Sequence, residues 1–140
     1  MIDTDYEERC MRGPHEIHKP VKDEESAHPI ATVWRPVLQE IVKQFIAGNY
    51  RLEQSVKRVA PTSAAKADQI KNYIADYGET LVELPDTTWS TSISQWMGFH
   101  WELLVDLWTL ESGRSDLVLS ARVYEDRGDF RFEIDSVHVP

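Results

Sequence analysis

The chain has a single cysteine, few positive charges and no long apolar run. Cys10 cannot form an internal disulfide, which disfavours a disulfide-stabilised protein of an oxidising compartment. No apolar run approaches the roughly 20 residues of a membrane-spanning helix. The N-terminal MIDTDYEER is acidic and no apolar stretch follows it, which argues against a secretory signal. We therefore expect a cytoplasmic protein.

Glycine is also scarce, and the remaining composition fits one globular domain. The 6 glycines exclude a collagen-like chain, and the 5 Trp, 5 Tyr and 4 Phe exclude a wholly disordered one. Hydrophobic residues make up 41% of the chain and charged residues 28%, as in ordinary soluble domains. Its 140 residues are enough to bury a core of their own.

Positive charge is the clearest deficit. Lys and Arg total 15 against 24 Asp and Glu, which gives a formal net charge of −9 and a pI near 4.9. Such a surface repels nucleic-acid phosphates and anionic lipid, so we expect neither nucleic acid nor membrane as a partner. The negative charge can steer association with a basic protein partner, or it can serve solubility alone.

Residues 1–27 are predicted to form a flexible or loosely docked arm, followed by a single domain over residues 28–140. The arm has eight acidic and four basic side chains and sparse apolar residues without a period, too few to offset the entropy of ordering. Cys10, His15 and His18 follow the spacing C-x4-H-x2-H. A zinc site needs four ligands and no second cluster completes this one, so we expect no metal site and no cofactor.

An amphipathic helix is predicted to begin after Thr32 and to stop at Gly48. Thr32 is a plausible N-cap, Pro36 lies near the first turn, where its missing N–H costs little, and Gly48 is a reasonable C-terminal stop. Apolar residues repeat at intervals of three and four along one face: Ile30, Val33, Trp34, Val37, Leu38, Ile41, Val42, Phe45 and Ile46.

A second helix is predicted between residues 63 and 78. Pro61-Thr62-Ser63 offers an N-terminal cap and Gly78 ends the pattern. Residues 50–60 have no clean period, and residues 81–84 form a short strand or extended piece before Pro85. The buried stripe of this helix consists of Ala67, Ile70, Ile74 and Tyr77.

The C-terminal third is predicted to be β structure. Residues 100–110 are apolar on both faces of a strand, which is typical of a central strand covered on both sides. Residues 117–123 and 130–134 alternate, and the apolar phase shifts by one residue after Asp135, which predicts a β-bulge. We therefore predict an α+β fold, with two N-terminal helices packed on a curved antiparallel sheet that ends in a C-terminal meander.

No nucleotide-binding or hydrolase signature is present, whether G-x-G-x-x-G, GK[ST], a nucleophile elbow or H-E-x-x-H. The densest polar group contains His100, Glu102, Asp106 and Trp108, which share one face of a predicted strand. Carboxylates about 7–14 Å from a histidine along a strand could act with it as general acid and base, and His100 with Asp106 is the candidate catalytic pair. The alternative is structural: Glu102 and Asp106 anchor a loop or pair with Arg114 at the sheet margin.

Four tryptophans of the C-terminal half allow three interpretations. Aromatic side chains line ligand pockets, Trp and Arg dominate interface hot spots, and several tryptophans in a small domain most often belong to its core. The candidate binding residues are these tryptophans with the charged residues of the turn after residue 110: Trp89, Trp96, Trp101, Trp108, Arg114 and Asp116.

The C-terminal half also carries a family resemblance. Tyr73-x3-Tyr77-Gly78, Leu84-Pro85, Trp89, Trp101, His138-Val139 and above all LWTLESGRSDL resemble small acidic bacterial domains of unassigned function, over roughly Val33–Pro140. More loosely, the chain resembles the nuclear-transport-factor-2-like cone fold, in which helices wrap a curved sheet and leave a cavity. In size and charge it resembles immunity proteins, which neutralise a co-encoded toxin. None of these resemblances implies a catalytic residue.

Three functional hypotheses follow. The first is a non-enzymatic, immunity-like binding protein that uses acidic residues and tryptophan surface against a basic protein partner. The second is a small-molecule-binding or enzymatic cone-fold domain that uses His100 and Asp106. The third is a subunit that oligomerises through its sheet, since the sequence leaves the oligomeric state open.

Overall fold

A computed structural model describes residues 16–140, and it confirms the α+β fold class. Two helices, α2 (Arg35–Ile46) and α3 (Ala64–Tyr77), accompany a six-stranded sheet with the order β1-β3-β4-β5-β6, in which β2 also pairs with β4. All named strand pairs are antiparallel. The strands are β1 (His28–Pro29), β2 (Leu81–Val82), β3 (Ile93–Trp96), β4 (Trp101–Thr109), β5 (Gly113–Asp126) and β6 (Asp129–His138).

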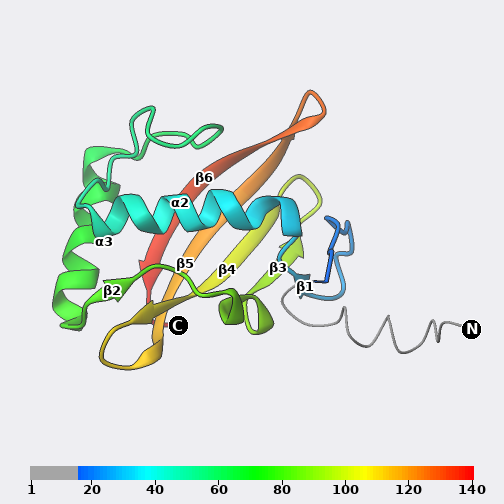
Figure 1. Ribbon diagram of the computed structural model, residues 1–140. Helices are drawn as coiled ribbons and strands as arrows, with labels where there is room; N and C mark the ends of the chain where they lie inside the picture. The colour runs from blue at the N-terminus through cyan, green and yellow to red at the C-terminus, as the bar shows by residue number, and fades with distance from the viewer. Residues whose placement is uncertain (1–15) are drawn as a thin grey trace, which may run out of the picture.

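The helix α2 crosses one face of the sheet (Figure 1) and buries Leu38, Ile41, Val42 and Phe45 against it. The predicted N-cap at Thr32 is wrong, because residues 32–34 form a 3-10 turn and the helix begins at Arg35. The Thr32 hydroxyl instead accepts a hydrogen bond from the His18 amide at 2.7 Å. This side chain therefore joins α2 to the chain that precedes it.

The helix α3 lies along β6 and has the predicted ends. The Ser63 side chain accepts from the Lys66 amide, and Gly78 ends the helix in the left-handed region at φ 81°, a conformation that glycine adopts without steric cost. Residues 50–60, which lacked a period, form an irregular loop outside the helices and named strands. Leu52 and Arg58 have positive φ angles there, and Leu52 is nonetheless fully buried.

The strand β4 is the centre of the sheet and is covered on one face only. Its odd-numbered residues from Trp101 to Thr109 are buried, whereas Glu102, Leu104, Asp106 and Trp108 are exposed or half-buried. Leu104 is 38% exposed. The predicted covering of both faces is therefore wrong: α2 packs on one face and α3 lies along the β6 edge, so no described helix lies over the other face.

Two bulges bend the long strands. Ser120 pairs with Ser136 and Ala121 with Ile134, so Asp135 is an extra residue, and the bulge predicted there is confirmed. A second irregularity places residues 115–117 of β5 opposite Leu107 of β4. It is held by Ser115, whose hydroxyl donates to the Leu107 carbonyl at 2.7 Å.

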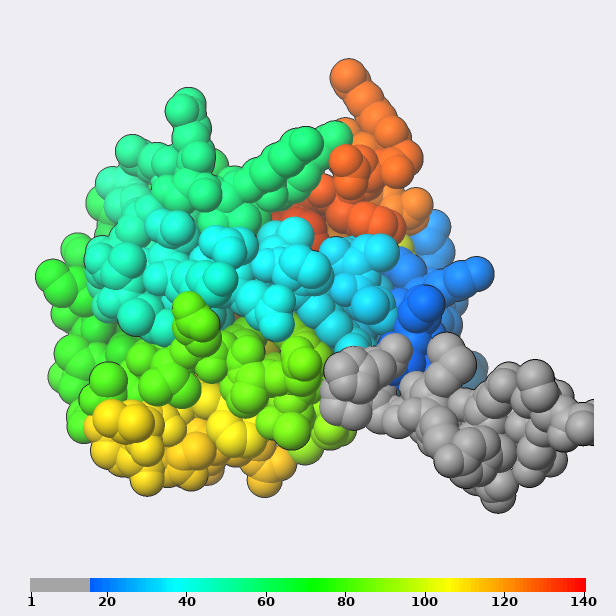
Figure 2. All heavy atoms as spheres, viewed as in Figure 1, coloured from blue at the N-terminus to red at the C-terminus, as the bar shows by residue number. Residues whose placement is uncertain are grey.

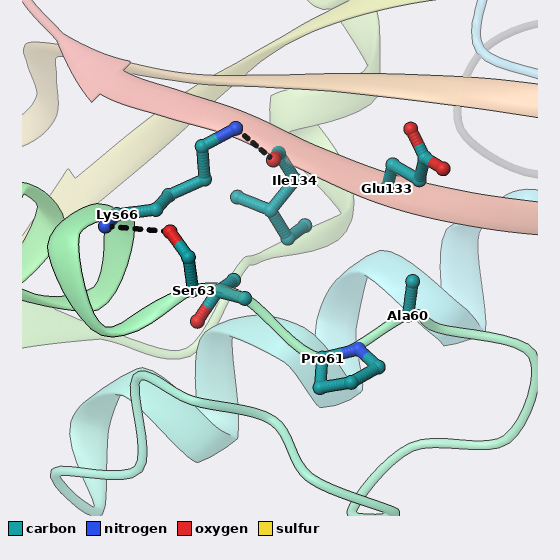
Figure 3. A pocket seen from close by; sticks show the side chains of 7 residues that line it. Ala60, Pro61, Ser63, Lys66, Glu133 and Ile134 are labelled. Carbon is teal, nitrogen blue, oxygen red and sulfur yellow. Dashed lines mark hydrogen bonds between the residues drawn. The ribbon is translucent and has the colours of Figure 1, made fainter.

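The outer edge of β6 is closed by side chains of α3. The Lys66 ammonium donates to the Ile134 carbonyl at 3.1 Å, beside a shallow pocket of about 200 Å³ (Figure 3). The Gln69 amide donates to the Val137 carbonyl at 2.9 Å. These contacts satisfy carbonyls that an open strand edge would offer to another chain.

Residues 16–27, called here the N-terminal segment, belong to the arm that was predicted to be flexible or loosely docked, and they lie against the sheet and the start of α2 (Figure 2). The Trp101 indole donates to the Val21 carbonyl, and the Gln95 amide donates to the Asp23 carbonyl, both at 2.9 Å. Composition left docking open as one of two alternatives, because backbone carbonyls make these contacts. Residues 1–15 of the predicted arm, with Cys10 and His15, lie outside the described residues.

Candidate functional site

The face of the sheet that no described helix covers is called here the open face. Its membership follows from strand alternation and register, because residues directly opposite in neighbouring strands point to the same side. It carries Ile93, Gln95, Glu102, Leu104, Asp106, Trp108, Arg114, Val118, Ser120, Arg122, Tyr124, Arg131, Glu133, Ser136 and His138.

A row of side chains crosses the middle of the open face. These side chains are aliphatic on β3 and β4 and are serines on β5 and β6. Ile93 lies opposite Leu104, and each is 38% exposed. Leu104 also lies opposite Ser120, and Ser120 opposite Ser136. A partner can therefore contact the aliphatic side chains of this row without meeting a bulky side chain on β5 or β6.

Charged side chains surround this row. Arg131 pairs with Glu133 at 2.7 Å and stacks over the Tyr124 ring at 4.7 Å. Arg122 lies 3.8 Å from Asp135, and its pKa is raised by a hydrogen bond with Tyr124 and by the charge of Asp135. Both arginines are thus matched by carboxylates on the same part of the sheet.

Two further carboxylates, those of Glu102 and Asp106, belong to the open face. Glu102 lies opposite Arg122, and its Oε1 is 3.7 Å from the His100 Nε2. The Asp106 carboxylate accepts a hydrogen bond from the Thr91 hydroxyl. With the bulge residue Asp135, the face carries four carboxylates against three guanidinium groups, those of Arg114, Arg122 and Arg131.

The predicted catalytic pair is not brought together. His100 closes the β3–β4 hairpin, where its carbonyl accepts from the Met97 amide at 2.8 Å and its ring lies 5.2 Å from the Tyr124 ring. Asp106 lies six residues further along extended chain, a separation of about 20 Å. One small substrate cannot contact both groups at that distance, and the earlier estimate of 7–14 Å fits Glu102 rather than Asp106.

The His100 ring is unusual in one respect. Its Nε2 is buried and, among the described residues, has no hydrogen-bond partner. The Glu102 carboxylate lies beyond hydrogen-bond length at 3.7 Å. This imidazole therefore packs against Tyr124 without a positioned acceptor.

Asp106, Arg114 and Asp116 meet at a corner of the open face. They line a pocket of about 500 Å³, called here the corner pocket, together with Ser115, Val118, Val139 and Pro140. Trp108 lies opposite Arg114 and covers Gly113. Three of the six predicted binding residues, Trp108, Arg114 and Asp116, are therefore neighbours.

The other three predicted binding residues lie on the helix side. Trp89 is 4% and Trp101 is 1% exposed, so both belong to the core and offer almost no surface to a partner while the N-terminal segment is in place. Trp96 is half-buried, 4.6 Å from Trp101 between ring centroids. The burial agrees with the core interpretation for Trp89 and Trp101.

Some exposed apolar side chains near the open face were not predicted from the sequence. Phe99 is 87% and Met97 is 47% exposed at the tip of the β3–β4 hairpin, and Ile93 and Leu104 form the apolar row. The signal was present in Met-Gly-Phe between two alternating stretches, because a glycine turn places its neighbours at a hairpin tip.

Within residues 16–140, no group of three or more His, Cys, Asp or Glu side chains could hold a metal ion. No helix in that part of the chain is long and apolar enough to cross a membrane. The predicted metal absence remains a prediction, since Cys10 and His15 are not described.

Comparison with known proteins gives a family. No curated protein and no solved structure matches the chain, so the likeness to the nuclear-transport-factor-2-like cone is not confirmed. A family model described as "Domain of unknown function (DUF7668)" matches residues 42–140, which include the open face and the corner pocket. This agrees with the predicted resemblance to domains of unassigned function. Since the match spans well over half its length, the chain belongs to this family.

Proposed function

We propose that this chain is a non-enzymatic binding protein of the bacterial cytoplasm that engages a basic protein partner through the open face. The observation that carries the proposal is the apolar row of Ile93 and Leu104, exposed at the centre of a sheet face and surrounded by charged groups. An apolar centre with a polar rim is the usual anatomy of a protein interface.

Charge supports a basic partner. The chain has a formal net charge of −9, and on the open face Glu133 and Asp135 match Arg131 and Arg122. Glu102 and Asp106 bring the carboxylates of the face to four against three arginines, Arg114 included, so the face itself has an acidic excess of one group. Attraction between opposite charges accelerates the encounter of two proteins, and repulsion between like charges disfavours acidic competitors.

An immunity-like role is the form of this proposal that we favour, because small acidic proteins of this kind neutralise basic toxins. A gene for a basic toxin directly beside the gene of this chain would support it. The partner then binds by surface complementarity, and no residue of this chain performs chemistry.

The test compares two substitutions that each replace an exposed aliphatic residue with arginine. Leu104→Arg places a positive charge in the apolar row, and Ile46→Arg, at a residue 45% exposed on α2, is the matched control on the other side. Tagged wild type and both variants are used for affinity capture from the native host, after circular dichroism has shown equal folding.

We expect wild type and Ile46→Arg to retain the same basic protein, and Leu104→Arg to lose it. Equal capture by all three proteins contradicts the open face as the site. Reproducible capture of acidic proteins only, or of none, contradicts the basic partner.

The corner pocket favours a second candidate, a small-molecule-binding domain. It gathers two carboxylates and one guanidinium, from Asp106, Asp116 and Arg114, in about 500 Å³. In that case Asp106→Asn abolishes binding or turnover of a small molecule at nearly unchanged melting temperature, whereas His100→Gln, at the far end of the strand, leaves it intact.

A further inference from the structure

A side chain of the N-terminal segment occupies a small aromatic and acidic site. The Lys22 ammonium lies 5.1 Å from the Trp96 ring centroid and 6.0 Å from that of Trp101. It also forms an ion pair with the Glu125 carboxylate. Two indole rings and one carboxylate around an ammonium make up a cation–π site supported by an ion pair.

The position of the segment does not depend on this lysine. The residues on both sides of it are held through their backbone carbonyls, Val21 by the Trp101 indole and Asp23 by the Gln95 amide. The Asp23 carboxylate is also bonded to the His28 ring at 3.0 Å. Removing the Lys22 side chain should therefore empty the site and leave its surroundings in place.

The walls of the site are preformed. The Trp101 ring is 1% exposed and packs against Trp34 at 5.1 Å and Phe130 at 6.0 Å, and Trp96 packs against it at 4.6 Å. A ring fixed by core contacts does not need to be ordered when a ligand binds, which lowers the cost of binding.

The site is also accessible. The Lys22 side chain is 53% exposed and that of Glu125 is 49% exposed, and the segment lies on the surface beside the N-terminal end of α2 (Figure 2). Trp96, Trp101 and Glu125 lie within the residues matched by the family model, whereas Lys22 lies outside them. The three residues that surround the ammonium group thus belong to the family domain, whereas Lys22 does not.

We propose that Trp96, Trp101 and Glu125 form a binding site for an alkylammonium group, which Lys22 fills within the chain and which a lysine side chain of another protein fills when Lys22 withdraws. The site lies on the helix side of the sheet, because Trp96 and Trp101 are register partners and Trp101 is in the core. It is therefore separate from the open face and does not require that face to bind anything.

The test uses Lys22→Ala and the indole N–H signals of Trp96 and Trp101 in ¹⁵N–¹H spectra, assigned with Trp96→Phe. Titration with n-butylammonium chloride should shift both signals saturably in Lys22→Ala, while the Trp108 signal stays fixed. In wild type the apparent affinity should be about tenfold weaker, because the tethered Lys22 competes for the site. Sodium chloride at equal ionic strength should produce no saturable shift.

Two further variants test whether the response depends on this site. Lys22→Ala/Glu125→Gln should lose most of the response, and Lys22→Ser, whose short side chain also leaves the site empty, should behave like Lys22→Ala and replaces it if that variant is unstable. A tripeptide with lysine between two glycines should bind to Lys22→Ala, and its norleucine analogue should not.

Absence of a saturable shift in Lys22→Ala and Lys22→Ser overturns the proposal and leaves Lys22 with a structural role only. Equal shifts in wild type, Lys22→Ala and the Glu125 variant overturn it as well, because the response would then not depend on the site. Neither result bears on the open face, whose own test uses Leu104.

Discussion

Thr88 and Ser92 substitute for a missing strand beside the middle of β4. The strand pairs with β3 over residues 101–104 and with β2 over residues 108–109. Between them, the Thr88 hydroxyl donates to the Asp106 carbonyl at 2.7 Å, and the Ser92 hydroxyl accepts from the Asp106 amide at 3.0 Å. Thr88 is fully buried and Ser92 is 2% exposed, so water has little access to these groups.

We predict that Thr88→Val destabilises the protein by about 1–3 kcal/mol, because it keeps the side-chain shape and leaves a buried carbonyl without its donor. In urea the midpoint should fall while the m value stays constant. The melting temperature should fall by about 3–10 °C for a domain of this size.

The control for this prediction is Thr87→Val, which changes an exposed threonine and should stay within about 0.5 kcal/mol of wild type. Thr88→Val/Ser92→Ala should cost a different amount from the sum of the single changes, because both hydroxyls serve one residue of β4. A Thr88→Val protein as stable as wild type refutes the view that these hydroxyls replace a strand.

Two further predictions concern charged groups near the N-terminal end of α2. The pKa of Asp23 is lowered chiefly by its hydrogen bond with His28, so His28→Ala should raise it toward the ordinary aspartate value in a carboxyl NMR titration; an unchanged pKa contradicts this. Because the folded-state pKa lies below the unfolded one, this contribution to stability is present above the unfolded pKa and disappears as pH falls through the folded pKa. Arg35 is 6% exposed, and burial lowers its pKa. Its guanidinium group donates to the Ile30 carbonyl from Nε at 3.1 Å and from Nη2 at 2.9 Å, and it stacks on the Trp89 ring at 5.4 Å. Arg35→Lys replaces the planar guanidinium group with an ammonium group and should lower the free energy of unfolding in urea by about 1–3 kcal/mol. A decrease below about 0.5 kcal/mol would contradict a stabilising role for the guanidinium group.

Local signals in the sequence predicted the elements whose ends depend on neighbouring residues. The ends of α3 lie at Ser63 and Gly78 because a hydroxyl cap and a left-handed glycine each affect only the adjacent turn of the helix. The phase shift after Asp135 predicted the bulge because alternation in β6 records which side faces the core. These features need no knowledge of distant contacts.

The rest depends on contacts between residues far apart in the chain. The docking of residues 16–27 is invisible in composition because carbonyls of Val21 and Asp23 make it. The candidate pair of His100 and Asp106 shares a strand face, but alternation gives the side of a residue and not its distance from another. The grouping of Asp106 with Arg114 and Asp116 depends on the irregular register between β4 and β5, which the sequence did not predict.

Carboxyl labelling followed by mass spectrometry tests the open face most directly, once a partner has been captured. The label is applied to the free protein and to the complex, and the reactivity of Glu102 and Asp106 is compared with that of Glu40 on α2, an exposed residue of the helix side. We predict that the complex protects Glu102 and Asp106 and leaves Glu40 unchanged. Protection of Glu40 with unchanged reactivity at Glu102 and Asp106 would contradict recognition through the open face.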